Sequence, residues 1–208
     1  MSTVQLRPAA PDFSGSRTFS ALRSACLGEM HARRLYLQCA RRMEDADLYV
    51  IAHAFRFTAD QEKEHADIFR GLIAAHGGPG VPMAEDAPLL LPGEPLELLR
   101  IVTQAEHNEW DVLYPHNARI AMEEGYLRIA SAFRRIAETE HLHARRFLQY
   151  MHALQEGRLF RDEKHTSWFC LPCGQLHTGQ EAPKTCSGCG HSQGHFIRSS
   201  FFPFVIEG

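Results

Sequence analysis

The spacing of apolar residues divides the chain into a long helical part and a short C-terminal part. From Thr18 to about Glu156, apolar residues recur every three or four positions, as in amphipathic helices. This pattern pauses at EDADLY, in the Gly- and Pro-rich stretch 76–95, and at MEEGY, and it ends at Gly157. The pattern therefore predicts four helices, near residues 18–44, 46–76, 94–122 and 125–156.

The connections between these helices are a short turn, a long connection and a second short turn. One long crossover is typical of the ferritin-like variant of the four-helix bundle. We therefore expect a mainly α chain with a ferritin-like four-helix bundle over residues 18–156, preceded by a mobile arm of residues 1–17. A charged linker, 157–166, then leads to a small segment, 167–208, that is rich in Cys, Gly and aromatic residues.

Acidic residues interrupt the apolar stripe of every predicted helix. In the second helix, Glu62 lies two turns after Phe55 on the same face, and His65 lies one turn further. In the fourth helix, Glu140 occupies the same kind of position, and His143 follows three residues later. The first and third helices add the in-phase carboxylates Glu29, Glu106 and Glu109.

Five carboxylates with two imidazoles cannot remain uncompensated inside a marginally stable bundle, because an isolated buried charge costs several kcal/mol. Arg33 is the one basic side chain near the helix face that carries these carboxylates, and it could equally lie along the rim of the bundle. Two divalent or trivalent metal ions would nearly balance the charge. Two Glu-x-x-His motifs with further glutamates are the di-iron or di-manganese pattern, and zinc is less suited to it. A third Glu-x-x-His, at Glu138 and His141, is rotated off the stripe, so we expect it outside the site.

The C-terminal segment contains four of the six cysteines in a metal-binding spacing. Cys170 and Cys173 form one Cys-x2-Cys pair, and Cys186 and Cys189 form a second pair after twelve intervening residues. Two such pairs can close a tetrahedral tetrathiolate site. Taken alone, the motif favours a structural zinc ribbon. Beside a redox-active di-metal bundle, it favours an iron that relays one electron at a time, and both metals remain open.

The overall composition restricts the surroundings of the protein. A net charge of −3, from 22 Lys+Arg and 25 Asp+Glu, gives no reason to expect nucleic acid or an anionic membrane as a partner. The N-terminal sequence lacks the apolar core of a signal peptide, and no apolar run approaches the roughly 18 residues of a membrane span. We therefore expect a cytoplasmic protein with unpaired cysteines.

Together these motifs resemble the rubrerythrin family, in which a ferritin-like di-iron bundle precedes a rubredoxin-like domain. They occur here as GEMHARRLY, ADQEKEHA, AEHNEWDVLYP and ETEHLHARRF, followed by the two Cys pairs. The resemblance runs from about residue 18 to 198, and it makes segment 167–208 the rubredoxin-like domain with its four-cysteine site. Gln175 and Ser187 depart from the family pattern, which has an aromatic residue and a proline at these places.

The resemblance implies a peroxidase that reduces hydrogen peroxide to water at two irons in the bundle. One iron in the four-cysteine site, or zinc in its place, completes the implied metals, and the iron there would relay electrons from an external NAD(P)H-dependent reductase. Tyr36 and Tyr114 match tyrosines near the irons and would orient glutamate ligands or bound oxygen. The resemblance also implies a head-to-tail homodimer.

Two other functions remain compatible with the sequence. Ferritin-like iron oxidation and storage would require large soluble cages, and the extra C-terminal domain argues against it. A non-enzymatic metal or redox sensor with a structural zinc ribbon would show negligible turnover and a colourless C-terminal domain.

Overall fold

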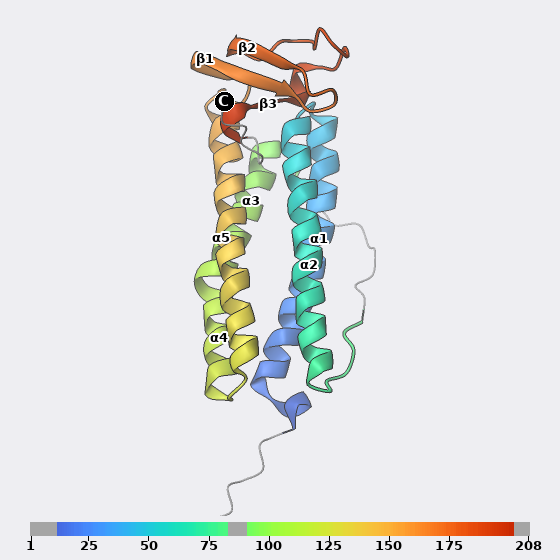
Figure 1. The fold of residues 1–208 in the computed structure, drawn as a ribbon, viewed down its shortest axis with the longest axis vertical. Coiled ribbons are helices and arrows are strands. Elements are labelled where there is room, and N and C mark those ends of the chain that lie inside the picture. The colour runs from blue at the N-terminus through green and yellow to red at the C-terminus, as the bar shows by residue number, and fades with distance from the viewer. Residues whose placement is uncertain (1–11, 83–90, 202–208) are drawn as a thin grey trace, which may run out of the picture.

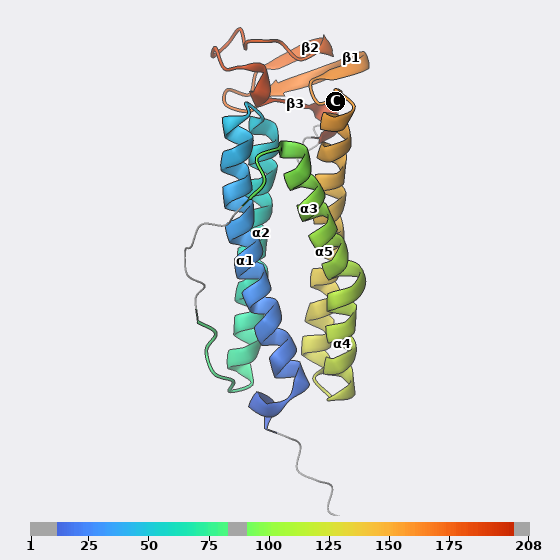
Figure 2. The same cartoon turned by 180° about the vertical axis from the view of Figure 1, so that it is seen from behind.

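The computed structural model describes residues 12–82 and 91–201, which form a helical bundle with a small sheet at one end (Figure 1). Two helical hairpins lie side by side, one made by α1 and α2 and the other by α3, α4 and α5 (Figure 2). None of the helices in these ranges is long and apolar enough to cross a membrane. The helices are α1 (Arg17–Asp45), α2 (Tyr49–Ala75), α3 (Pro95–Asn108), α4 (Tyr114–Glu123) and α5 (Leu127–Gln155). The strands are β1 (Arg161–Cys170), β2 (Leu176–Glu181) and β3 (Phe196–Arg198).

The third predicted helix is interrupted, because a π-helical segment, Glu109–Leu113, separates α3 from α4. Pro115 follows this segment and has no amide hydrogen, so the regular bonding pattern cannot continue through it. Instead, the amide of Tyr114 donates to the carbonyl of Glu109, five residues earlier. An ordinary helical turn followed by a wider π-helical turn takes up about eight residues. Tyr114 is eight residues after Glu106, so it lies on the same helix face as Glu106.

The chain before α1 is partly folded, which differs from the mobile arm expected for residues 1–17. Phe13 is 7% exposed, and its ring centroid lies 5.6 Å from that of Phe19 and 5.3 Å from that of Tyr126. The hydroxyl of Ser16 accepts a hydrogen bond of 3.0 Å from the amide of Phe19, which caps α1. The expected arm therefore joins the bundle from residue 12 onward, and residues 1–11 lie outside the described part.

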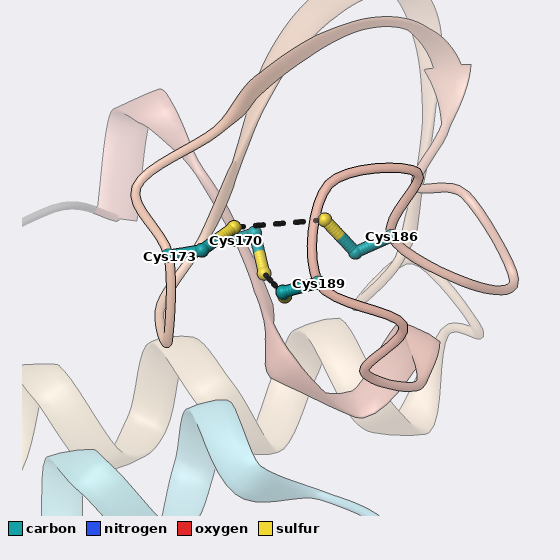
Figure 3. Close-up of side chains that lie close together, drawn as sticks. All are labelled: Cys170, Cys173, Cys186 and Cys189. Atoms are coloured by element: carbon teal, nitrogen blue, oxygen red, sulfur yellow. Dashed lines mark hydrogen bonds between the residues drawn. The ribbon is translucent and has the colours of Figure 1, made fainter.

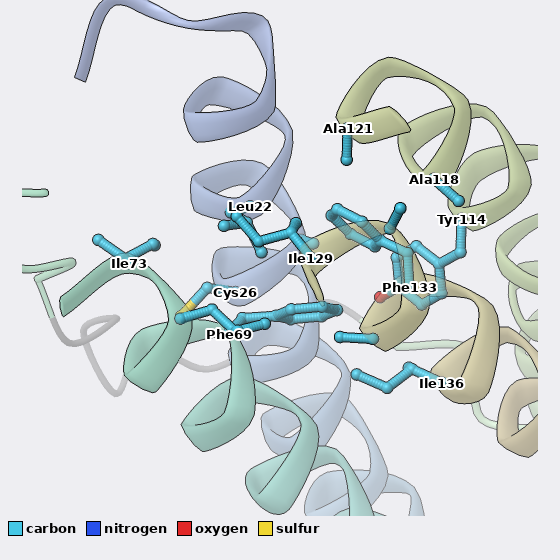
Figure 4. Packing of buried hydrophobic residues seen from close by; sticks show 14 of the residues in the cluster. Leu22, Cys26, Phe69, Ile73, Tyr114, Ala118, Ala121, Ile129, Phe133 and Ile136 are labelled. Atoms are coloured by element: carbon cyan, nitrogen blue, oxygen red, sulfur yellow. The ribbon is translucent and has the colours of Figure 1, made fainter. Parts of the chain in front are cut away.

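Two apolar clusters fill the bundle. Between them lies a layer of buried acidic side chains, called the acidic layer here: Glu29, Glu62, Glu106 and Glu140. The first cluster lies toward the α4–α5 turn and includes Leu22, Phe69 and Phe133 (Figure 4). The second lies toward the sheet and includes Phe55 and Phe147, whose ring centroids are 4.7 Å apart. The acidic layer is therefore enclosed by apolar packing at both ends.

The C-terminal region is a three-stranded antiparallel sheet in the order β2-β1-β3. Strand β1 begins at Arg161, so it includes the last six residues of the predicted linker 157–166. Trp168 is fully buried in this small domain, and its indole N–H donates to the carbonyl of Gly179 over 3.1 Å. The sheet supports the two loops that carry the cysteines. Residues 202–208 lie outside the described part.

The small domain rests on the end of the bundle formed by the α1–α2 turn (Figures 1 and 2). The Ser192 hydroxyl donates a 2.6 Å hydrogen bond to Asp47, and the His195 ring stacks on Tyr49 with centroids 3.8 Å apart. Gly194 packs directly on this turn, and a Cβ there would collide with the backbone carbonyl of Asp47. The contact therefore requires a glycine at this position.

We expect Gly194→Ala to weaken the contact between the small domain and the bundle, because the turn at Asp47 is backbone and cannot move aside. The free energy of unfolding should fall by about 1–3 kcal/mol in a denaturant titration, as for other overpacked sites. Gly71→Ala is the matched control, since nothing lies within 4 Å of the added Cβ. That change should stabilise α2 by roughly 0.5–1 kcal/mol. Unchanged stability in Gly194→Ala would contradict the observed docking.

Candidate metal centres

Six ionisable side chains from four helices meet between the two apolar clusters. They form two overlapping groups in which the possible ligand atoms lie within 4.8 Å of one another. Glu62 and Glu140 belong to both groups, so their carboxylates can bridge two metal ions. The first group is completed by Glu29 and His65, and the second by Glu106 and His143.

The two bridging carboxylates each turn one oxygen toward each imidazole. Nδ1 of His65 lies 2.8 Å from Oε1 of Glu140 and 3.1 Å from Oε2 of Glu62. Nδ1 of His143 lies 2.6 Å from Oε2 of Glu140 and 3.0 Å from Oε1 of Glu62. The site therefore has two similar halves that share the same pair of carboxylates.

Burial and mutual repulsion perturb the acidity of these groups. Burial, followed by repulsion from neighbouring carboxylates, raises the pKa of Glu29 well above its usual range. Burial also raises the pKa of Glu106 to about 8. For Glu62, burial is outweighed by the two neighbouring imidazoles, His143 and His65, which lower the pKa to about 2. For His143, burial is outweighed by its carboxylate partners, which raise the pKa to about 12. The interior therefore holds excess negative charge that protons or cations must compensate.

The unpartnered atoms in this layer fit metal ions. Buried oxygens of Glu29, Glu62, Glu106 and Glu140, and Nδ1 of His143, make no hydrogen bond within the described part of the chain. Nδ1 of His143 lies 2.6 Å from a Glu140 oxygen and 3.0 Å from a Glu62 oxygen without the geometry of a hydrogen bond to either. An unsatisfied buried polar atom costs about 1–3 kcal/mol. Oxygen-rich donors with one imidazole in each half suit a pair of iron ions.

Glu109 differs from the other predicted ligands because it lies in neither group. It is half-buried and is the first residue of the π-helical segment. Burial, followed by repulsion from Glu106 and Glu140, raises its pKa to about 9, so it still senses the acidic layer. The structure therefore brings together six of the seven predicted bundle ligands and leaves Glu109 beside them.

The two predicted tyrosines contact different glutamates from opposite apolar clusters. The Tyr36 hydroxyl donates to Oε1 of Glu106 over 2.5 Å, and the Tyr114 hydroxyl donates to Oε1 of Glu29. Burial raises the pKa of both phenols well above the ordinary value, so both remain hydrogen-bond donors. Each tyrosine therefore restricts the orientation of one terminal carboxylate.

Other polar residues near the stripe lie outside the acidic layer. Glu138 is exposed, and His141 lines an outer groove with Trp110, its ring centroid 4.4 Å from that of the indole. Arg33 donates to the carboxylate of Asp60 over 3.1 Å on the outside of α2. The sequence analysis offered Arg33 as a basic side chain near the layer and missed Arg146, which donates to the side-chain oxygen of Gln61 over 3.3 Å. The position of Arg146, three residues after His143, was a usable signal.

The four cysteines of the small domain converge on one point (Figure 3). The sulfur atoms of Cys170 and Cys189 are 3.5 Å apart, and those of Cys173 and Cys186 are 3.7 Å apart. A tetrahedral site with metal–sulfur bonds of about 2.3 Å has sulfur–sulfur edges of about 3.8 Å. The spacing therefore fits one tetrahedrally bound ion, and all four thiols are free of disulfides.

Both cysteine loops use the same local geometry. Gly174 and Gly190 have φ values of 74° and 76°, which glycine adopts readily. Their amides donate to the carbonyls of Cys170 and Cys186 at 2.8 and 2.9 Å and close the loops. The sequence pattern Cys-x2-Cys-Gly thus produces each half of the site by itself.

Polar side chains also surround the sulfur atoms. Nδ1 of His191 lies 3.2 Å from the sulfur of Cys189. The two residues that depart from the family pattern contact each other, because the Gln175 amide donates to the Ser187 hydroxyl over 3.3 Å. This bond joins the two cysteine loops.

The fold and these two centres define a ferritin-like di-metal carboxylate protein with a C-terminal tetrathiolate domain. The family model described as Rubrerythrin matches residues 20–87 and 97–172. The model described as Rubrerythrin, rubredoxin-like domain matches residues 168–197. The chain belongs to the rubrerythrin family. Two iron ions are therefore assigned to the bundle, and one iron, or zinc, to the four cysteines.

Curated relatives agree with this assignment. A rubrerythrin of Nitratidesulfovibrio vulgaris is 36% identical over 182 residues, which cover 88% of this chain and 94% of the relative. A rubrerythrin of Porphyromonas gingivalis is also 36% identical over 182 residues, covering 88% of this chain and 90% of the relative.

Solved structures share the fold. Fully reduced nigerythrin superposes with a TM-score of 0.61 at 24% identity, covering 95% of this chain and 100% of that chain. Desulfovibrio desulfuricans bacterioferritin gives a TM-score of 0.63 at 20% identity, covering 68% of this chain and 82% of that chain. The second match shows the predicted ferritin-like fold over 68% of this chain.

We expect Glu140→Ala and His143→Ala to lose the bundle metal, because each removes a ligand from a buried group. Glu138→Ala and His141→Ala should keep it, since these side chains lie outside the layer. Metal analysis of the four purified variants tests this, with the metal of the tetrathiolate domain as an internal reference. Loss of bundle metal only in the second pair would show that the opposite face of α5 carries the ligands.

Metal loading should release protons. In the metal-free chain the pKa of Glu106 is raised to about 8 and that of His143 to about 12, so both groups hold protons at neutral pH. A metal ion must displace those protons, and its affinity should therefore increase as the pH rises and decrease as it falls. Manganese(II) titrations between about pH 6 and pH 8, in buffers of different ionisation enthalpy, measure both effects. An affinity that does not change with pH would contradict the expectation.

Proposed function

We propose that this chain is a non-haem di-iron peroxidase that reduces hydrogen peroxide to water. The observation that carries the proposal is the presence, in one chain, of a buried dinuclear carboxylate site and a mononuclear tetrathiolate site. The first suits two-electron chemistry, and the second suits the transfer of single electrons. The balanced reaction consumes one hydrogen peroxide, two electrons and two protons, and it produces two water molecules.

Two adjacent ferrous ions, when bound, supply together the two electrons that cleavage of the O–O bond requires. The chain's own residues keep such a pair adjacent, because Glu62 and Glu140 contribute to both halves of the site. The hydroxyl of Tyr36 holds Glu106 in place by a hydrogen bond. The hydroxyl of Tyr114 holds Glu29 in the same way. The apolar clusters on both sides limit the access of water to the layer.

The position of the tetrathiolate domain supports a role for a second chain. The domain contacts α2 at Tyr49, and Glu62 lies thirteen positions further along the same helix. This separation corresponds to about 20 Å along the helix axis. A head-to-tail homodimer would bring the tetrathiolate domain of one chain closer to the bundle of the other. We propose this arrangement, with electrons supplied to the tetrathiolate iron by an external NAD(P)H-dependent reductase in the cytoplasm.

Cys189→Ser should separate the relay from peroxide cleavage. Steady-state peroxide reduction driven by NAD(P)H and a reductase should fall to a small fraction of the wild-type rate, because electrons no longer reach the bundle. The same variant, reduced chemically beforehand, should still consume about one peroxide per dinuclear site, since the two electrons are stored there.

Cys39→Ala serves as the control, because Cys39 is a buried thiol outside both metal sites. It should retain both activities. If Cys189→Ser turned over as fast as the wild type, the tetrathiolate domain would be a structural zinc ribbon and the relay would be wrong. Absence of peroxide consumption by the pre-reduced wild type would reject the peroxidase itself.

A further inference from the structure

His143 is contacted on both sides of its ring, toward the acidic layer and away from it. Its Nδ1 faces the bridging carboxylates. Its Nε2 lies 3.1 Å from the side-chain oxygen of Gln61, on α2. The same oxygen lies 3.3 Å from Nη1 of Arg146, which is one turn beyond His143 on α5. The side-chain oxygen of Gln61 therefore links α2 to α5 on the side of the His143 ring that faces away from the acidic layer.

These contacts determine which ring nitrogen carries a proton. A guanidinium can only donate hydrogen bonds, so the Gln61 amide must direct its oxygen toward Arg146. That oxygen can only accept, and a hydrogen bond with His143 therefore requires a proton on Nε2. In the neutral ring this leaves the lone pair on Nδ1, which faces the bridging carboxylates.

Arg146 is itself held in place. Its Nη1 donates to the hydroxyl oxygen of Thr58 over 2.7 Å, and that hydroxyl donates to the carbonyl of Ala54 over 2.9 Å. The guanidinium carbon also lies 5.0 Å from the centre of the Phe57 ring, a cation–π contact. A continuous series of hydrogen bonds therefore runs from the backbone of α2 to the imidazole. In each of them it is clear which group donates and which accepts.

His65, the other imidazole, has no corresponding support from the described part of the chain. Its Nδ1 approaches Glu62 and Glu140 in the same way. Within the two described ranges, however, no hydrogen bond reaches its Nε2. The two halves of the dinuclear site are therefore similar in their carboxylates and different in how firmly the imidazole is held.

We propose that Gln61 and Arg146 are positioning residues that keep His143 in the Nε2–H tautomer and aim its Nδ1 at one metal ion. The ion in the group of Glu106 and His143 is then held more firmly than the ion in the group of Glu29 and His65. The inference rests on the metal centre and not on peroxide reduction, and its test involves no turnover. Its failure and the failure of the peroxidase proposal are therefore distinguishable.

Manganese(II) binding to the metal-free full chain tests the proposal. Gln61→Leu removes the acceptor, and it should weaken the binding of one of the two bundle ions by about 10–100-fold, the usual effect of losing such a partner. The other ion should bind as in the wild type. Gln61→Glu should restore the affinity, because a carboxylate can accept from both His143 and Arg146. Gln149→Leu, the same change at an exposed position on α5, should alter neither ion.

Two results in this titration would overturn the proposal. One is wild-type affinity for both ions in Gln61→Leu. The other is an equal loss at both ions together with a lower melting temperature of the metal-free chain, which would indicate a merely structural role.

A measurement on the wild type applies even if Gln61→Leu does not fold. In the zinc-loaded full chain, proton–nitrogen NMR of the imidazoles should show a slowly exchanging proton on Nε2 of His143. The Nε2 proton of His65 should exchange faster, because no group in the described part of the chain accepts it. A proton on Nδ1 of His143, or equally fast exchange at both rings, would also overturn the proposal.

Discussion

Burial of several carboxylates between two apolar clusters is the constraint on which the rest of the structure depends. Glu29, Glu62, Glu106 and Glu140 are almost completely buried, and each would be costly as an isolated charge. Burial, followed by repulsion between neighbouring carboxylates, raises the pKa values of Glu29 and Glu106. The folded chain is therefore arranged around cations. Glu62 and Glu140, which belong to both ligand groups, allow two cations to be bound side by side.

The packing of the bundle and the orientation of the ligands are coupled. One tyrosine projects from each apolar cluster and donates to a terminal glutamate, so a change of packing on either side would reach the site. The π-helical segment Glu109–Leu113 contributes to the same result, because it returns Tyr114 to the inner face. It also begins with Glu109, which leaves that carboxylate beside the layer.

The two centres differ in chemistry as well as in place. The bundle offers carboxylates and imidazoles, which suit iron in a dinuclear site, whereas the small domain offers four thiolates. Ser192 and His195 hold the small domain at the end of the bundle through contacts to the α1–α2 turn and the start of α2.

The local spacing in the sequence determined the ligand motifs. The offset from Glu62 to His65, that from Glu140 to His143, and the Cys-x2-Cys-Gly loops are geometries within one turn or one loop, so the sequence is enough to predict them. Only the tertiary structure showed that β1 starts at Arg161, that a π-helical segment divides the third helix, and that Gln61 and Arg146 meet behind His143. The contact of Gln61 with Arg146 and His143 depends on how α2 and α5 face each other. A periodic pattern along a single helix does not contain that information.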